Sequence, residues 1–463
     1  MIVMKFGGTS VEDAASMKNV VRLVEREIPK RPVVVVSAIA GATNALLRFA
    51  HLAFEGKLET AGAELNGLLE RHVTILENLV DDRASMQAVL LLVRRKFEEL
   101  RNLYTGIALL GELTPRSLDA IASFGELTSS MILAEGFRAH GMEAELINAR
   151  TFLLTDDHFG NASPLLQEID ASTKREILPR LERGKLVVTQ GYIGSTRGGV
   201  TSTLGRGGSD FTAALIGASL NATEIQIWTD VDGIMTADPH IIPAAKKLKL
   251  VSFREAAELA YFGAKVLHPS TILPAVQKNI PVVVLNSKKP LSTGTRILSD
   301  PPKSNSMIKS IASKAGITVI NIRSTRMLMA YGFLESIFAC FNRHKTPVDL
   351  VSTSEVAVSL TVDDASQLDA IVEELEQFAE VTVFPRLAIV CVVGEELRST
   401  AGVAGRLFRA LGDINVIMIS QGASEINMSL VVEEQFTREA VRRLHQEFFE
   451  RVPEPEIFES VLP

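Results

Sequence analysis

Short apolar runs alternate with amphipathic stretches through residues 1–290 of this 463-residue chain. Six runs rich in β-branched residues are predicted strands: 2–6, 32–37, 143–148, 185–190, 225–228 and 281–285. Between them, apolar residues recur at helical spacing, as they do over residues 11–25. Fully apolar strands separated by helices are typical of a parallel sheet with both faces covered. We therefore predict an α/β fold with an open, mostly parallel sheet sandwiched by helices.

Two stretches depart from this alternation. Residues 58–110 are rich in Leu, Glu, Arg and Ala and carry no strand signal, so we expect a long helical excursion that serves as a structural insertion. Residues 291–306 are rich in Pro, Ser and Lys, which is typical of a domain end followed by a linker. The predicted first domain is 1–295, and the predicted linker is 296–306.

The chain after the linker repeats itself at a spacing of 70 residues. The shift aligns Gly332 with Gly402, and the Ser-Glu pair at 354–355 with the pair at 424–425. Each copy has the pattern of a strand, a helix led by glycine, two strands, and a second helix before a last strand. Two βαββαβ modules behind a larger domain predict a regulatory tail, with a purely structural pair as the alternative.

Composition and charge exclude several classes of protein. The formal net charge is −7, from 48 basic and 55 acidic residues, which argues against binding nucleic acid by phosphate neutralisation. No window approaches about 18 uninterrupted apolar residues, so we expect no membrane span. The two cysteines, Cys340 and Cys391, exclude a disulfide framework and an all-cysteine zinc site within one chain. With no signal-peptide pattern at the N-terminus, these features predict a cytoplasmic protein.

Two glycine-rich loops are candidate anion sites. In KFGGTS at 5–10, Lys5 stands at the end of a predicted strand, and two glycines lead to a helix start. Backbone N–H groups can approach a phosphate where no side chain intervenes, although two glycines after a strand are more often only a tight turn. In TLGRGGSD, Arg206 lies among three glycines before a helix that Ser209 or Asp210 would cap. This arginine suits bidentate capture of a carboxylate or phosphate, unless it merely faces solvent.

The remaining candidates are weaker. The segment 228–239 carries three aspartates after a predicted strand, at the edge where ligands lie in open α/β sheets, but turn-forming aspartates are an equal alternative. Lys265 and Glu126 lie in short glycine-containing motifs, and a lone charged residue is most often on the surface. The GxSxG and HExxH motifs are absent, and we recognise no cysteine–histidine pair of metal-ligand spacing. Hydrolase and metalloprotease functions are therefore disfavoured, and no protein metal site is expected.

Taken together, six motifs resemble those of one known family. They are KFGGTS at 5–10, SAIAGATN at 37–44, FGELTS at 124–129, TLGRGGSD at 203–210, WTDVDGIMTADP at 228–239 and FGAKVLHP at 262–269. In this order they resemble aspartate kinases, and the repeated tail resembles a pair of ACT domains. The resemblance implies the amino-acid-kinase fold and transfer of the γ-phosphoryl group of MgATP to the side-chain carboxylate of L-aspartate, giving 4-phospho-L-aspartate and ADP. In such relatives this reaction opens the pathway to lysine, threonine and methionine.

The resemblance also implies roles for individual residues. The residues implied in catalysis are Lys5 at the transferring phosphoryl group, Arg206 at the α-carboxylate of aspartate, and Asp210 as the organiser of Lys5. The residues implied in binding aspartate are Thr43, Glu126, Arg206, Gly207, Gly208 and Ser209, with Glu126 paired to the ammonium group. The residues implied in binding ATP are Lys5, Gly7, Gly8, Thr229, Asp230, Met235, His240, Lys265 and Val266. Magnesium is expected on ATP oxygens and water, with no protein ligand.

In the tail, a set of residues resembles the effector site of lysine-sensitive aspartate kinases. They are Met327, Gly332, Phe333, Leu334, Val348, Asp349, Ser354 and Glu355. Lysine is therefore the expected inhibitor, and threonine is the alternative because 419–425 resembles threonine-responsive members. In relatives one ACT domain is inserted in the other, which implies a first ACT domain at 324–393 and a second built from 307–323 and 394–463. ACT domains commonly pair, so a homodimer or higher homo-oligomer is expected.

Two other functions remain open at this point. Another amino-acid kinase, such as an acetylglutamate kinase, would share the glycine loops but usually lacks the ACT pair. A catalytically dead amino-acid sensor would have degraded catalytic positions, yet Lys5, Glu126, Arg206, Asp210 and Lys265 are all present. No GxGxxG dinucleotide motif follows the second repeat, so we expect no attached homoserine dehydrogenase.

Overall fold

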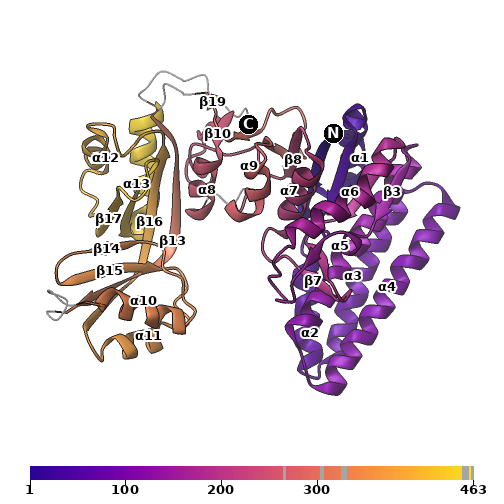
Figure 1. The fold of residues 1–463 in the computed structure, drawn as a ribbon, viewed down its shortest axis with the longest axis horizontal. Coiled ribbons are helices and arrows are strands. Elements are labelled where there is room, and N and C mark those ends of the chain that lie inside the picture. The colour runs from indigo at the N-terminus through magenta and orange to yellow at the C-terminus, as the bar shows by residue number, and fades with distance from the viewer. Residues whose placement is uncertain (264–266, 303–306, 325–330, 451–457, 460–463) are drawn as a thin grey trace. The chain divides into compact units, whose positions relative to one another are not determined.

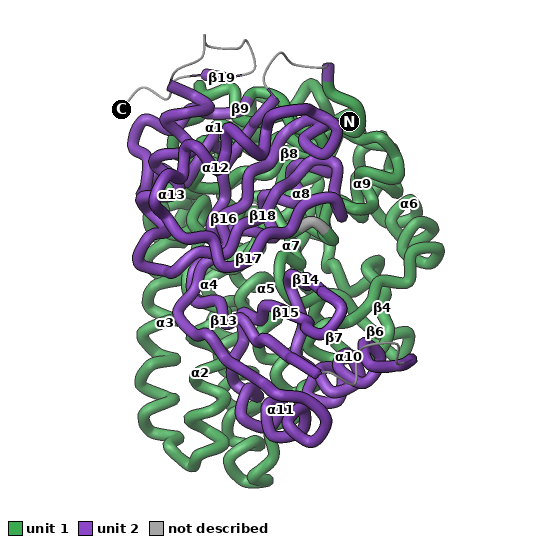
Figure 2. The backbone as a smooth tube through the Cα atoms, turned by 90° about the vertical axis from the view of Figure 1, so that its left-hand side faces the viewer, with its two compact units in different colours: residues 1–234, 249–253, 266–301 green, residues 235–248, 254–265, 302–463 purple. Residues whose placement is uncertain are grey.

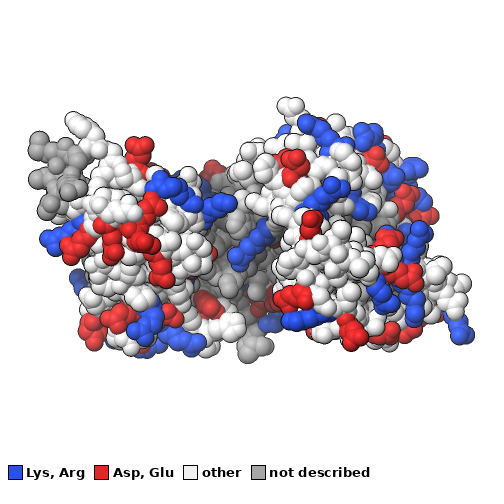
Figure 3. Space-filling model, turned by 90° about the horizontal axis from the view of Figure 1, so that it is seen from below, with Lys and Arg blue, Asp and Glu red and all other residues white. Residues whose placement is uncertain are grey.

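The computed structural model describes residues 1–263, 267–302, 307–324, 331–450 and 458–459 (Figure 1). The chain divides into two compact units, which Figure 2 colours separately. The first comprises 1–234, 249–253 and 266–301, and the second comprises 235–248, 254–265 and 302–463. In the described part of the chain, no helix is long and apolar enough to cross a membrane. On the face shown in Figure 3, basic and acidic side chains are interspersed.

The first unit is built on an eight-stranded sheet. Its strands, in spatial order, are β10 (Leu250–Ser252), β12 (Thr295–Leu298), β11 (Val282–Asn286), β8 (Glu224–Thr229), β1 (Ile2–Phe6), β2 (Pro32–Val36), β5 (Leu186–Gln190) and β3 (Ala144–Ile147). Every neighbouring pair is parallel except β11 with β12. Strands β1 and β2 are buried along their whole length, in agreement with their apolar sequences. The predicted mostly parallel sheet is therefore confirmed.

Helices cover both faces of this sheet. They are α1 (Ala14–Glu27), α2 (Ala42–Phe54), α3 (Leu58–Leu79), α4 (Arg83–Leu110), α5 (Pro115–Ala139), α6 (Leu166–Glu182), α7 (Gly208–Leu220) and α9 (Leu273–Gln277). One core cluster joins alternate residues of β1, namely Ile2, Met4 and Phe6, to helices α1–α5. Val3 points to the opposite face and is equally buried, and α7 contacts β1, β2 and β8 there. A small additional sheet contains β4 (Leu154–Thr155), β6 (Ile193–Thr196) and β7 (Thr201–Thr203).

The second unit is built on a six-stranded antiparallel sheet. Its strands, in spatial order, are β14 (Val351–Thr353), β15 (Ala357–Val362), β13 (Ile308–Arg323), β16 (Glu380–Gly394), β18 (Asn427–Glu433) and β17 (Met418–Gln421). Its helices are α8 (Phe253–Tyr261, from Arg254 onward), α10 (Phe333–Arg343), α11 (Leu368–Leu375), α12 (Val403–Leu411) and α13 (Thr437–His445). A separate two-stranded pair joins β9 (Lys247–Leu248) to β19 (Phe458–Glu459).

The internal repeat of the sequence is visible in this sheet. Gly332 and Gly402 are the N-cap residues of α10 and α12, with φ angles of 82° and 84°, a left-handed conformation that favours glycine. The long strands β13 and β16 pair along their length and serve both halves, since one end of β13 pairs with β15 and one end of β16 pairs with β18. Because these shared strands run through both halves, the boundaries of the two expected ACT domains stay a prediction.

Candidate active site

A cavity of about 560 Å³ lies in the first unit, at the carboxyl ends of parallel strands. Lys5 reaches it from β1 and Glu126 from α5, while Tyr192 follows β5. Of the residues predicted to bind aspartate or phosphate, the cavity brings together Lys5, Gly8, Thr43, Glu126, Arg206, Gly207, Gly208, Ser209 and Asp210. Ligands bind at this edge of open α/β sheets because the loops there converge from several strands.

Lys5 and Asp210 form an ion pair in the cavity wall. Lys5 Nζ lies 2.7 Å from Asp210 Oδ1, and the two side chains are only 11% and 12% exposed. Strand β1 is buried between β2 and β8, so it holds the lysine stem in a fixed place. Asp210 lies in the first turn of α7, where the helix dipole also favours a negative charge. A buried ammonium group needs such a partner, and the pair places the Lys5 ammonium group at the cavity wall.

Glu126 is a buried carboxylate with one free oxygen. Its Oε1 accepts a hydrogen bond from Ala38 N–H at 3.2 Å, whereas Oε2 is buried and has no partner among the described residues. Burial raises the pKa of Glu126 to about 8, against smaller lowering effects of the Ala38 hydrogen bond and the Lys5 charge. Gly125 allows this close approach of α5, because a Cβ there would lie 2.8 Å from Ala38 Cβ. The site therefore lacks a hydrogen-bond donor at this oxygen.

Arg206 lies in a loop that only glycine could shape at two points. Gly205 and Gly207 both have φ angles of 72°. Gly207 is the N-cap of α7, without a side-chain cap, so the expectation that Ser209 or Asp210 caps this helix is wrong. The left-handed glycine sets the chain direction, which leaves Asp210 free to pair with a lysine. Arg206 is exposed and forms no hydrogen bond or ion pair within the described part of the chain.

The first part of the predicted nucleotide set lies at the same sheet edge. Gly7 follows β1, while Thr229 ends the neighbouring strand β8 and Asp230 follows it. The N–H of Gly7 donates to the carbonyl oxygen of Trp228 at 3.0 Å. This amide therefore ties two strand ends together, and the nucleotide role of Gly7 stays a prediction. The Thr229 hydroxyl donates to Asp230 Oδ1 at 3.1 Å.

The rest of the predicted nucleotide set falls elsewhere. Met235 and His240 belong to the second unit, where the exposed His240 has its Nδ1 3.0 Å from Asp238 Oδ1. Lys265 and Val266 lie outside the described residues. The nucleotide role of these four residues therefore stays a prediction.

Comparison with known proteins decides the family. The sequence model of the amino acid kinase family matches residues 1–286, and that of an ACT domain matches residues 390–448. Aspartokinase 2, chloroplastic, of Arabidopsis thaliana is 39% identical to this chain over 97% of it and 85% of the relative. The chain belongs to the aspartokinase family. Its activity is therefore that of an aspartokinase, a kinase with a carboxylate as acceptor, and the resemblance inferred from six motifs is confirmed.

Solved structures of aspartokinases share the whole fold. The structure of Escherichia coli aspartokinase III in complex with aspartate and ADP, described as the R-state, has a TM-score of 0.84 and 36% identity, covering 97% of this chain and all of that one (100%). The complex of the same enzyme with lysine and aspartate, described as the T-state, has a TM-score of 0.82 and 36% identity over 97% and 99% of the two chains. The predicted amino-acid-kinase fold with an ACT-type tail is confirmed.

Two residues at or beside the cavity were not predicted from the sequence. Tyr192 lines the cavity with a φ angle of 66°, and burial raises the pKa of its phenol. Its place directly beyond an apolar strand was the one available signal. Asp119 is buried and accepts hydrogen bonds from Gly160 N–H and from both the N–H and hydroxyl of Thr203, which ties α5 to the loop at Gly160 and to the end of β7. A single aspartate in a helix carries no sequence signal for such a role.

The structure describes every predicted effector residue except Met327, which lies outside the described residues. Phe333 and Val348 pack against the core of the first repeat. The exposed members are Gly332, Leu334, Ser354 and Glu355. Asp349 differs from all of these, because its side chain is charged and only 3% exposed.

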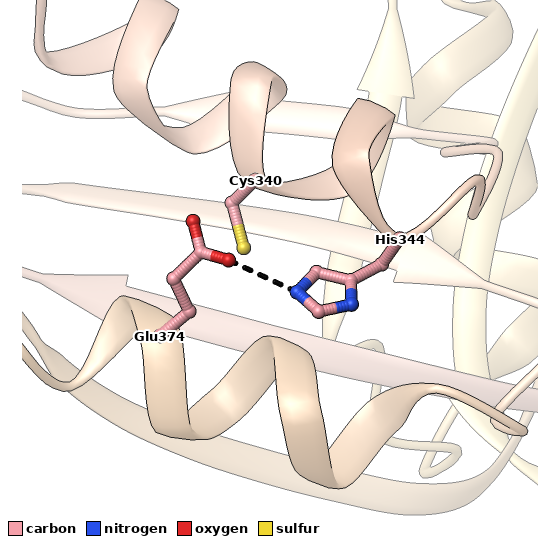
Figure 4. Close-up of side chains that lie close together, drawn as sticks. All are labelled: Cys340, His344 and Glu374. Atoms are coloured by element: carbon pink, nitrogen blue, oxygen red, sulfur yellow. Dashed lines mark hydrogen bonds and ion pairs between the residues drawn. The ribbon is translucent and has the colours of Figure 1, made fainter.

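A second cluster of possible ligands lies between α10 and α11. The ligand atoms of Cys340, His344 and Glu374 all lie within 4.8 Å of one another, and sequence analysis did not single out this cysteine–histidine pair (Figure 4). Glu374 already pairs with Arg343 and lies 3.0 Å from His344 Nε2. Burial and the Glu374 charge raise the pKa of the Cys340 thiol to about 11, so it stays protonated at neutral pH. We interpret the cluster as a hydrogen-bonded ion-pair network that ties the two helices together.

Proposed function

We propose that the cavity binds L-aspartate with Glu126 at its ammonium group and Arg206 at its α-carboxylate. The observation that carries this proposal is that one cavity holds a buried Glu126 oxygen without a donor and the Arg206 guanidinium without an acceptor among the described residues. An α-amino acid supplies both missing partners at once. Thr43, Gly207, Gly208 and Ser209 line the same cavity and complete the proposed aspartate site.

Phosphoryl transfer at this site needs positive charge rather than a base. The attacking side-chain carboxylate of aspartate is already an anion at neutral pH, and the difficulty is to bring it to an anionic triphosphate. Lys5 would contact the transferring phosphoryl group and neutralise charge that develops there. Asp210, 2.7 Å from Lys5 Nζ, would hold the ammonium group in place and does not act as a base.

The second substrate is proposed to be ATP. Gly8 lines the cavity and packs closely on the next loop, because a Cβ there would lie 3.0 Å from the Ala38 carbonyl oxygen, and we propose that the triphosphate lies along this glycine turn. Lys5 Nζ and the N-terminus of α7 add positive charge. By family resemblance, Gly7, Thr229, Asp230, Met235, His240, Lys265 and Val266 complete the nucleotide site. Magnesium, when bound to the phosphate oxygens, would supply further charge neutralisation.

The tail is proposed to carry feedback inhibition. A lysine complex is known for the E. coli relative, which supports lysine as the effector, with threonine as the alternative. The proposed effector residues are Met327, Gly332, Phe333, Leu334, Val348, Asp349, Ser354 and Glu355. We also propose a catalytic domain at 1–295, a linker at 296–306, ACT domains at 324–393 and at 307–323 with 394–463, and a homodimer or higher homo-oligomer through the ACT pair. The cytoplasmic location stays a prediction.

One assay tests the reaction and its regulation together. ADP release is measured with MgATP and L-aspartate, with hydroxylamine added to trap the acyl phosphate as a hydroxamate, and then again with lysine and with threonine. We expect aspartate-dependent hydroxamate that lysine suppresses. Hydroxamate with N-acetylglutamate but not with aspartate would show that the amino-acid pocket is misassigned. Absence of hydroxamate with any acid, while lysine still binds, would instead indicate an amino-acid sensor.

A further inference from the structure

Asp349 in the second unit is a buried carboxylate that already has an internal donor. Its Oδ1 accepts a hydrogen bond from the Tyr261 hydroxyl at 2.5 Å and lies 3.5 Å from Lys314 Nζ. Its Oδ2 is buried and has no partner among the described residues. The backbone is fixed as well, since Asp349 N–H donates to the Thr361 carbonyl oxygen at 3.0 Å. The carboxylate therefore stays in place while its donors can change.

Tyr261 makes the shorter of the two contacts to this carboxylate. Lys314 Nζ lies closer to Asp363, at 2.7 Å, than to Asp349, and it also lies 5.2 Å from the centroid of the Tyr261 ring. Burial and the hydrogen bond to Asp349 raise the pKa of the Tyr261 phenol, so the hydroxyl remains a donor at neutral pH. The phenol is the group that an incoming cation must replace.

Tyr261 is also the last residue of α8, and one side of this helix contacts the rest of the second unit at several points. Glu258, one turn before it on α8, accepts hydrogen bonds from Ser424 and Asn427. Glu255, a further turn back, pairs with Lys309 at 2.9 Å. Residues three or four apart share one face of a helix, so these contacts and that of Tyr261 form a single row. Glu255 and Glu258 contact β13 and the second repeat, whereas Tyr261 contacts the first repeat.

We infer that Tyr261 competes with the ammonium group of the amino-acid effector for Asp349, and that its displacement releases the end of α8 from the first repeat. This inference rests on the proposed assignment of Asp349 to the effector site. An ammonium group has three donors and can satisfy both carboxylate oxygens, including the one that now has none. The helix leads in sequence directly into the FGAKVLHP motif at 262–269, which family resemblance assigns to the nucleotide. Effector binding and the Tyr261–Asp349 hydrogen bond therefore exclude each other, so each weakens the other.

The variant Tyr261→Phe tests this coupling in the full-length enzyme, because it keeps the ring and removes only the hydroxyl. We expect half-maximal inhibition at an L-lysine concentration about three- to tenfold lower than in the wild type, since binding no longer breaks a hydrogen bond to a charged group. Tyr104→Phe is the matched control, because its hydroxyl donates to the Leu46 carbonyl oxygen in the other unit. L-lysine binding is measured by calorimetry and inhibition by the hydroxamate assay.

Hydrogen exchange provides a second readout at the helix itself. We expect L-lysine to increase amide exchange over residues 254–263 in the wild type, and Tyr261→Phe to show part of that increase without L-lysine. Asp349→Asn should abolish inhibition and keep kinase activity. If Asp349→Asn abolishes inhibition while Tyr261→Phe leaves both the lysine response and the exchange unchanged, the effector site stands and the coupling is wrong. If Asp349→Asn remains fully inhibited by L-lysine, the effector assignment and the coupling both fail, while the kinase assignment is untouched.

Discussion

Two buried carboxylates, one in each unit, both have an oxygen without a hydrogen-bond partner, but their surroundings differ. Glu126 Oε2 and Asp349 Oδ2 are both buried without a hydrogen-bond partner among the described residues. Glu126 adjoins an open cavity that Arg206 also lines. Asp349, by contrast, is held through its other oxygen by Tyr261 and lies close to Lys314. The first carboxylate is ready for a ligand, and the second is already engaged.

This difference determines what ligand binding does with the free-energy cost of each unpartnered oxygen. Leaving a buried acceptor unsatisfied costs about 1–3 kcal/mol. At Glu126, a substrate ammonium supplies the missing donor without displacing any protein group, and below about pH 8 the only other requirement is loss of the Glu126 proton. At Asp349, an effector must first replace Tyr261, so part of the recovered free energy is spent on a structural change. A site of the first kind is suited to binding, whereas one of the second kind is suited to transmitting a signal.

The largest effect is expected from Lys5→Met, which removes the cation at the proposed reaction centre. We expect kcat to fall about 10³-fold, because a preorganised charge aimed at the transferring phosphoryl group is lost. Binding of the effector L-lysine at Asp349 should be unchanged. Lys174→Met is the control, since Lys174 is a half-exposed lysine that pairs with Asp170 on α6. A kcat within threefold of the wild type would reduce Lys5 to a structural partner of Asp210.

The next effect is expected at Arg206, the charge opposite Glu126. Arg206→Ala should raise the KM for aspartate about 100-fold, and Arg206→Lys about tenfold, because lysine keeps the charge but loses the bidentate fork. The KM for ATP and the lysine concentration for half-inhibition should change little. Arg197→Lys is the matched control, as Arg197 is an exposed arginine paired with Glu168. Equal KM values for aspartate in both Arg206 variants would argue against a bidentate contact.

The frame of the catalytic unit was predictable because its signals are local. The apolar runs at 2–6 and 32–37 became β1 and β2 with ends within one residue, and the Leu- and Glu-rich stretch at 58–110 became α3 and α4. Motifs likewise brought Lys5, Glu126 and Arg206 to attention, since each lies beside glycines that shape a loop or a helix approach. The roles of these residues rest on resemblance and on cavity geometry, and the variants above test them.

What could not be predicted depends on contacts between distant parts of the chain. Tyr261 and Asp349 are 88 residues apart, and Asp119 and Thr203 are 84 apart, with no local pattern to mark either pair. The cap of α7 was misjudged for a related reason. Ser and Asp are common N-cap residues, but Asp210 is bound to Lys5 from a distant strand, and Gly207 takes the cap instead.

A smaller effect should appear in the pH dependence of aspartate binding. The pKa of Glu126 is raised to about 8 by burial, so the empty site is protonated below that pH and must lose a proton to accept an ammonium group. The KM for aspartate should rise as pH falls below about 8, by up to about tenfold per unit. Glu126→Gln should raise the KM about tenfold at pH 8.5 and remove this pH dependence. A wild-type KM that stays flat from pH 6.5 to 8.5 would contradict the ammonium contact.

The smallest effect is expected in stability, when each of the two carboxylates is replaced by the corresponding amide. Because the folded-state pKa of Glu126 is raised, the native state binds more protons than the unfolded chain between about pH 4.5 and 8, and stability falls as pH rises through this range. Glu126→Gln removes that penalty, so we expect it to stabilise the ligand-free enzyme by about 1–3 kcal/mol at pH 9 and by almost nothing at pH 5. Asp349→Asn should instead destabilise it by about 1 kcal/mol, since the charged acceptor of Tyr261 is lost. Denaturant unfolding of both variants at the two pH values measures the difference. Destabilisation by both amides at pH 9 would mean that Glu126, like Asp349, is already satisfied inside the protein, and the contrast between an open and an engaged carboxylate would be lost.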